Sequence, residues 1–183
     1  MAELMFKNLI RITDEEKRLV LEWRNSERIR TKMVNKNIIS WEDHKHFIEQ
    51  LKSRKDCIYY LIYIDKTPIG VSSFTDIDLI SKSCSGGTYI GDTNYLGYGI
   101  PILYYCYVYL FENMNFNEHV FNVLKVNKRV YKMHKEIFHA RDRLENDKEW
   151  ILFHNQETYQ EMKKDLGSKI NNYCNIEKVT RIN

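Results

Sequence analysis

The sequence predicts a single mixed α+β domain in which helices flank a mostly antiparallel central sheet. Its clearest feature is the uncharged run 57–64, whose β-branched and aromatic side chains are typical of a strand covered on both faces. Turn residues at 65–68 separate this run from another at 69–74, which indicates an antiparallel hairpin. Helical segments with one apolar face lie between such runs, and no repeat or low-complexity linker divides the 183 residues.

The other elements follow in chain order. Residues 6–12 alternate apolar and polar side chains, which predicts the first strand. The hydroxyls of Thr13 and Ser40 are suited to cap helices that begin at residues 14 and 41. We then expect strands at 87–90 and 119–125, helices at 101–113 and 127–136, and a closing hairpin from 137–140 and 150–153.

The end of the domain is expected near residue 154. Residues 1–154 hold all of the strand and helix patterns described above. Residues 155–183 form a polar extension rich in lysine and asparagine, which is compatible with a surface helix and a loose tail.

Composition argues against several classes of protein. The 28 Lys and Arg residues nearly balance the 25 Asp and Glu residues, which gives a net charge of +3 and argues against a nucleic-acid binder. The longest uncharged apolar run, 100–111, is shorter than the about 20 residues that span a bilayer, and no signal peptide opens the chain. We therefore expect a cytoplasmic protein with no nucleic-acid or membrane partner. The scattered cysteines fit buried free thiols in a reducing compartment: Cys57, Cys84, Cys106 and Cys174.

The stretch 89–101 carries the strongest functional signal. It comprises a strand, a loop with Gly97 and Gly99, and a helix start. Glycines let the backbone approach a ligand closely, and a helix N-terminus favours a pyrophosphate. A tight strand-to-helix turn would explain the same pattern without a ligand. A P-loop and a Rossmann site are disfavoured, because the chain lacks G-x-x-x-x-G-K-[ST] and a third glycine in a βαβ unit.

The segment from Asn94 to Gly99 resembles the [QR]-x-x-G-x-[GA] motif of GNAT acetyltransferases, which binds the pyrophosphate of coenzyme A. Asn94 stands where the family usually has Gln or Arg. Downstream, Asn127, Val130 and His134 match the spacing of the family stretch N-x-x-A-x-x-x-Y. The resemblance implies a GNAT fold with strands splayed around the acetyl-CoA loop, no metal, and cofactor contacts from Tyr89, Ile90, Gly91, Asn94, Tyr95, Leu96, Gly97, Tyr98, Gly99, Ile100, Asn127 and Tyr131.

His134 occupies the position at which the family has the tyrosine that protonates the departing thiolate. A histidine with an ordinary pKa of about 6.5 could fill this role near neutral pH. The alternative is that His134 only packs inside its helix, in which case Tyr131 is the nearby substitute. Backbone N–H groups at 89–91 are expected to stabilise the oxyanion. The base stays open between Asp76, Asp92, Glu42 and water.

The N-terminal third narrows the acceptor. The residues Trp23-Arg24-Asn25, Arg30, Met33 and His44 resemble the W-R-N … R-x-x-M … I-s-x-e-x-H signature of one GNAT branch. That branch acetylates the 4-amino group of UDP-4-amino-4,6-dideoxy-N-acetyl-altrosamine in pseudaminic acid synthesis, which serves flagellin glycosylation. The segment can supply what a nucleotide sugar demands. Arg24 and Arg30 offer forked donors for phosphate oxygens. Asn25, His44 and His46 can hydrogen-bond sugar hydroxyls or the N-acetyl group, and Met33 and Trp41 can face the ring or base.

Two of these residues also have a structural interpretation. Trp23 fits a core position, and Arg24 could be the buried partner of an ion pair. His44 and His46 do not indicate a metal site, because side chains two apart on a helix point in different directions.

The sequence thus predicts an acetyl-CoA-dependent N-acetyltransferase acting on a nucleotide sugar, and a homodimer is compatible with it. Three alternatives stay open: another amine acceptor, such as a protein N-terminus or a different amino sugar; another acyl group; and a CoA-binding module without turnover.

Overall fold

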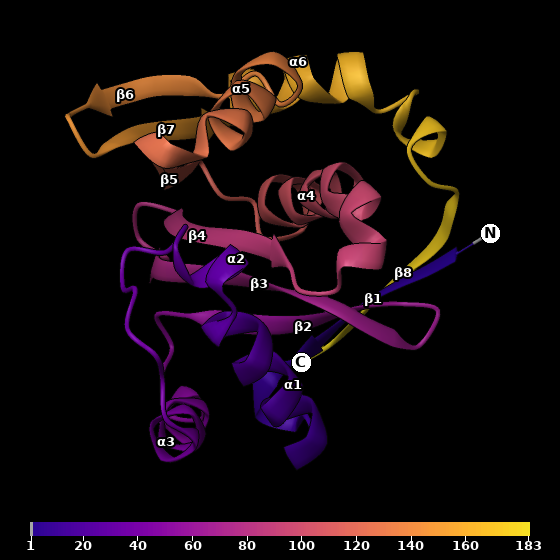
Figure 1. The fold of residues 1–183 in the computed structure, drawn as a ribbon. Coiled ribbons are helices and arrows are strands. Elements are labelled where there is room, and N and C mark those ends of the chain that lie inside the picture. The colour runs from indigo at the N-terminus through magenta and orange to yellow at the C-terminus, as the bar shows by residue number, and fades with distance from the viewer. Residues whose placement is uncertain (1) are drawn as a thin grey trace.

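The computed structural model describes residues 2–183, which form one eight-stranded mixed sheet flanked by helices (Figure 1). The strand order is β6-β7-β5-β4-β3-β2-β1-β8, with parallel pairing only between β4 and β5 and between β1 and β8 among these residues. The predicted fold class is therefore confirmed. The strands are β1 Ala2–Asn8, β2 Ile58–Ile64, β3 Thr67–Asp78, β4 Ser83–Ile90, β5 Glu118–Leu124, β6 Arg141–Glu145, β7 Glu149–Asn155 and β8 Ile176–Ile182.

Helices cover both faces of this sheet. They are α1 Asp14–Asn25, α2 Glu27–Arg30, α3 Trp41–Leu51, α4 Gly99–Val108, α5 Lys128–Glu136 and α6 Gln156–Leu166. In β2, Tyr60 and Ile62 face the core that contains α4 and α6, whereas Leu61 and Tyr63 face the core that contains α1 and α3. Burial on both faces is the reason that this strand carries no charge.

Local signals in the sequence located several boundaries correctly. Thr13 accepts the N–H of Glu16, whose carboxylate accepts the N–H of Thr13, so a capping box opens α1. Ser40 caps α3 through the N–H of Asp43. The β2–β3 hairpin turns at Asp65 and Lys66, which both have a positive φ, as a two-residue hairpin turn requires.

Two strand predictions were wrong. The first strand is Ala2–Asn8 and not 6–12, because the Asn8 side chain accepts the N–H of Ile10 and starts a 3₁₀ turn. Residues 137–140 are not a strand either, since His139 has a φ of 58° there. The hairpin partner of β7 is the charged β6, which lies at the edge of the sheet. Edge strands face water and do not need an apolar pattern.

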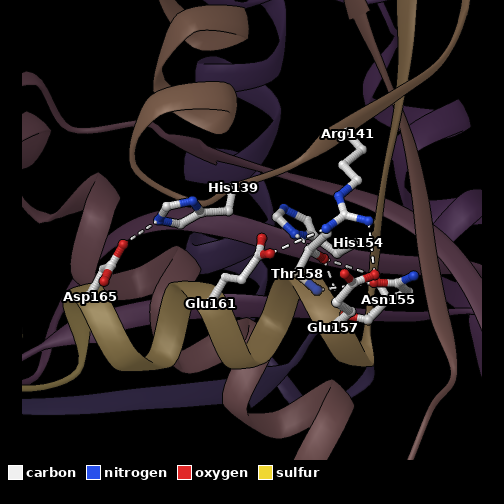
Figure 2. A network of polar contacts seen from close by, with 8 residues as sticks. All are labelled: His139, Arg141, His154, Asn155, Glu157, Thr158, Glu161 and Asp165. Atoms are coloured by element: carbon white, nitrogen blue, oxygen red, sulfur yellow. Dashed lines mark hydrogen bonds and ion pairs between the residues drawn. The ribbon is translucent and has the colours of Figure 1, made fainter.

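The expectation of a loose C-terminal tail was also wrong. Helix α6 buries Tyr159, Met162 and Leu166 in the main core, and β8 pairs with β1. The inward-facing side of α6 is apolar, although the composition of residues 155–183 is polar. Figure 2 shows a network of polar contacts made by α6, which includes the buried pair His154–Thr158 and ion pairs nearer the surface. Arg141 pairs with Glu157 and Glu161, and His139 lies 3.0 Å from Asp165.

Strands β4 and β5 separate soon after they meet. Only Ser83–Glu118 and Cys84–His119 are paired between them, and α4 begins just beyond the end of β4. In Figure 1 the half containing β5, β6 and β7 lies above α4, and the half containing β1 to β4 lies below it. Within residues 2–183, none of the helices combines the length and the apolar character needed to cross a bilayer.

Candidate active site

A cavity of about 1030 Å³ lies where β4 and β5 separate. Helices α1, α2 and α3 contribute to its wall on one side, and α4 and α5 on the other. Half of the site residues predicted from the sequence line it: Arg24, Met33, His44, Tyr89, Ile90, Leu96, Gly99, Asn127 and His134. The first three belong to the predicted acceptor set and the rest to the predicted CoA and catalytic set. Both sets therefore meet at one cavity.

The other predicted residues do not line this cavity: Asn25, Arg30, Gly91, Asn94, Tyr95, Gly97, Tyr98, Ile100 and Tyr131. Some of them stabilise the backbone that forms the wall of the cavity. The Asn25 amide exchanges two 2.9 Å hydrogen bonds with the backbone of Ile39, and Arg30 Nη1 donates to the Lys36 carbonyl at 2.8 Å. These contacts fix the loop that carries Met33.

Gly91 and Tyr131 have packing roles. A Cβ on Gly91 would lie 2.0 Å from a ring atom of Trp23, so only glycine fits against that partly buried ring. The Tyr131 ring stacks on Trp150 with 4.1 Å between centroids, and its hydroxyl donates to Asp142 at 3.1 Å. Tyr131 is thus turned toward β6 and β7.

The conformation of the glycine loop does not require the backbone freedom of its two glycines. Asp92 accepts the N–H of Asn94 and starts the 3₁₀ turn Thr93–Tyr98, which runs into α4. Neither Gly97 nor Gly99 has a positive φ, and a Cβ on either would meet nothing within 4 Å. No side chain caps the N-terminus of α4. The open space and the uncapped helix end together suit an anionic ligand that approaches the backbone.

The end of β4 presents backbone donors to the cavity. The N–H of Gly91 bonds to the Ile69 carbonyl of β3 at 2.7 Å. Because N–H groups alternate along a strand, those of Thr88 and Ile90 face the side from which β5 has departed. They are suitably placed for an oxyanion.

Arg28 is a functional candidate that sequence reasoning missed. Its Nη2 donates to the carbonyls of Ile90 and Gly91 at 2.9 and 2.6 Å, and its side chain lines the cavity. Ser26, with a ψ of 142°, breaks the helix between α1 and α2 and redirects Arg28 toward β4. If residues 23–30 are taken as one continuous helix, the direction of the Arg28 side chain cannot be predicted.

The acceptor end of the cavity contains polar atoms that lack a protein partner. Arg24 Nη2 donates to the Asn35 carbonyl at 2.7 Å, but its Nη1 is buried and unpaired. His44 Nε2 is likewise buried and unpaired. Burial lowers the pKa of both side chains. Arg24 makes no ion pair within residues 2–183, so the structure gives no support to the ion-pair interpretation.

The opposite end of the cavity contains a cluster of buried aromatic rings. His134 Nδ1 lies 3.4 Å from the Tyr107 hydroxyl, and the rings of His119 and His154 pack against Tyr107 at 5.7 and 4.4 Å between centroids. Burial lowers the pKa of His134 to about 3 and that of His119 to about 4. At neutral pH these rings are therefore uncharged in the free protein. His134 offers an imidazole N–H and not an imidazolium.

Of the three carboxylates considered as the base, one lines the cavity, namely Asp76. Asp92 caps the 3₁₀ turn, and Glu42 pairs with Lys45 at 2.8 Å on the surface. Within residues 2–183, no group of three or more His, Cys, Asp or Glu side chains is arranged to hold a metal ion.

No protein-family model matches the chain. Two curated relatives, both named Acetyltransferase PseH and both from strains of Campylobacter jejuni, are 29% identical over 133 and 134 residues. These matches cover 73% of this chain and 82% of each relative.

Comparison with solved structures supports the same similarity. The crystal structure of Campylobacter jejuni N-acetyltransferase PseH in complex with acetyl coenzyme A is 25% identical, covers 84% of this chain and 99% of its own, and has a TM-score of 0.69. FdhC, described as a nucleotide-linked sugar GNAT, is 20% identical over 91% of this chain and 93% of its own, with a TM-score of 0.74, and supports the fold alone. The GNAT fold and the predicted resemblance are therefore confirmed.

The buried histidines should make the fold sensitive to acid. Unfolded histidines bind a proton below a pH of about 6.5. The folded protein resists protonation of His119 and His134 down to their lowered pKa values of about 4 and 3. Their contribution is therefore complete above pH 6.5 and falls as the pH drops, by up to about 2 kcal/mol per histidine at pH 5.

Urea unfolding at pH 7.5 and pH 5.0 measures this loss. We expect His134→Gln to have a smaller stability difference between the two pH values than the wild type. His46→Gln changes an exposed histidine and serves as the control, with the wild-type pH dependence. Equal pH dependence in all three proteins would contradict the prediction.

Proposed function

We propose that this chain is an acetyl-CoA-dependent N-acetyltransferase whose acceptor is the 4-amino group of a UDP-4-amino-4,6-dideoxy sugar, as in pseudaminic-acid-type biosynthesis. The observation that carries the proposal is the single cavity lined by both predicted sets of residues. The similarity to PseH, including its complex with acetyl coenzyme A, supports acetyl-CoA as the donor.

The charge of the cavity supports an anionic acceptor. Its lining has four basic side chains and one carboxylate, namely Arg24, Arg28, Lys32 and Arg129 against Asp76. A polyamine would meet repulsion there, whereas a nucleotide diphosphate would be attracted. The unpaired Arg24 Nη1 supplies a charged N–H donor for phosphate, and His44 Nε2 can bond a sugar substituent.

The proposed reaction uses positioning and backbone polarity. The loop from Asn94 to Ile100 holds the pyrophosphate of acetyl-CoA, and Asn127 lies beside its pantetheine arm. Holding amine and thioester together contributes up to roughly 7–11 kcal/mol. The amine attacks the thioester carbonyl while the N–H groups of Thr88 and Ile90 stabilise the oxyanion.

Collapse of the intermediate releases the CoA sulfur. The C–S bond breaks and its electron pair passes to sulfur. His134 donates a hydrogen bond to that sulfur through an imidazole N–H, at the position where the family has a tyrosine O–H. The amine proton leaves to water or to Asp76, which is the carboxylate on the cavity wall among the three considered.

A product assay tests the proposal directly. The chain is mixed with acetyl-CoA and UDP-4-amino-4,6-dideoxy-N-acetyl-altrosamine, and the expected result by mass spectrometry is a nucleotide sugar one acetyl group heavier. Spermidine is the matched amine control and should stay unmodified, because the cavity is basic. Acetylation of spermidine alone would overturn the assignment of the acceptor.

Gly99→Val should abolish tight acetyl-CoA binding and leave the fold intact. The new side chain enters open space, so it strains no protein contact but occupies room beside the loop. Calorimetry should show an affinity at least about tenfold weaker, a loss of about 1.4 kcal/mol. Undiminished affinity in a protein with wild-type thermal unfolding would refute the loop assignment.

Arg24→Ala should raise KM for the nucleotide sugar by about tenfold or more, the effect of losing a charge-assisted hydrogen bond. The affinity for acetyl-CoA should not change. Arg30→Ala is the matched control, since both guanidiniums hold carbonyls of the same loop but only Arg24 lines the cavity. Equal effects of the two variants on KM would show that loop bracing explains both.

A further inference from the structure

His134 needs a defined tautomer in order to act on a ligand. A neutral imidazole has one N–H donor and one acceptor nitrogen, and only the nitrogen that faces the cavity can contact a substrate. What holds the proton on one nitrogen is the hydrogen bond made by the other. The neighbour of His134 Nδ1 therefore matters.

That neighbour is the hydroxyl of Tyr107, which projects from α4 at 3.4 Å. Burial raises the pKa of this phenol well above its usual range, so the hydroxyl keeps its proton. Within residues 2–183, the hydroxyl has no other hydrogen-bond partner than His134 Nδ1. If Nδ1 carried a proton, the Tyr107 O–H would have no acceptor in a buried site, which is costly.

The other nitrogen of His134 faces the cavity. Among the side-chain atoms of residues 2–183, the fully buried polar ones without a partner are Arg24 Nη1, Arg30 Nε, His44 Nε2, His119 Nδ1 and His154 Nε2. His134 Nε2 is absent from this set and makes no hydrogen bond within residues 2–183, so it is reached from the cavity that His134 lines.

Neighbouring elements keep both rings in place. Phe121 of β5 packs on His134 with 4.4 Å between centroids, and Phe138 packs on Tyr107 at 5.6 Å. The other titratable groups near the pair are the rings of His119 in β5 and His154 in β7 and the free thiols of Cys84 and Cys106, all of them buried. His154 Nδ1 is engaged by Thr158 Oγ1 at 3.3 Å.

We propose that Tyr107 is a positioning residue of this site: its hydroxyl donates to His134 Nδ1 and keeps the imidazole proton on Nε2, the nitrogen that faces the cavity. The value of this arrangement for acetyl transfer rests on the proposed function, but the tautomer is a property of the free protein. When the C–S bond breaks and its electron pair passes to sulfur, the Nε2 N–H donates a hydrogen bond to that sulfur. The firmly held Tyr107 proton prevents relay of a full proton, so the thiolate takes its proton from water.

Nitrogen-15 NMR of histidine-labelled protein at pH 7.5 tests the tautomer without substrates. We expect His134, assigned by its loss in His134→Gln, to be protonated at Nε2 and bare at Nδ1. Tyr107→Phe keeps the ring that packs in the cluster, and should shift His134 toward the Nδ1-protonated form. Tyr104→Phe, which removes another hydroxyl of α4, is the control and should leave His134 unchanged. A proton on Nδ1 in the wild type, or an unchanged tautomer in Tyr107→Phe, would overturn the proposal.

Kinetics separate positioning from packing. Tyr107→Phe should lower kcat by about tenfold with both KM values unchanged, as expected for loss of one hydrogen bond. In His134→Gln the further change Tyr107→Phe should have no effect on kcat, because the two residues act as a unit. Independent, multiplying effects would overturn the proposal. An inactive wild type with the expected tautomer would count against the proposed function and not against the role of Tyr107 in fixing the ring.

Discussion

The separation of β4 and β5 is the constraint on which the rest of the structure depends. Two residue pairs join these parallel strands before they part, so backbone groups of β4 are left on an open edge inside the protein. Buried backbone groups need partners. Arg28 satisfies the carbonyls of Ile90 and Gly91, while the N–H groups on the open edge face the cavity. The sheet thus creates both the space and the polar groups of the site.

The polar side chains around this space show the same incomplete pairing. Arg24 and His44 are desolvated and keep unpaired nitrogen atoms at one end, and His119 does so at the other. Leaving such atoms unpaired costs free energy, and a ligand that pairs them recovers it. Polar groups held by the fold in this way can act as fixed dipoles at a reacting centre.

Sequence could predict what local chemistry determines. The caps Thr13 and Ser40 and the β2–β3 turn depend on neighbouring residues alone, and all three were predicted. Half of the site residues that were predicted from motif spacing line the cavity. Arg28 and Tyr107 were missed for tertiary reasons, since a break at Ser26 aims one and the other lies in an apolar run typical of a core helix. The polar C-terminal segment was misjudged because composition hides its buried face.

That C-terminal segment bears on the site through α4. The loop that ends in Gly99 is only as fixed as the helix that follows it, and α4 shares its core with Tyr159, Met162 and Leu166 of α6. Phe111, just beyond α4, stacks on Tyr159 with 5.0 Å between centroids, and Arg181 of β8 donates to the Tyr105 carbonyl at 3.0 Å. Residues 156–182 therefore hold the helix that presents both the glycine loop and Tyr107 to the cavity. An extension with no predicted site residue of its own contributes to the geometry of both ends of the site.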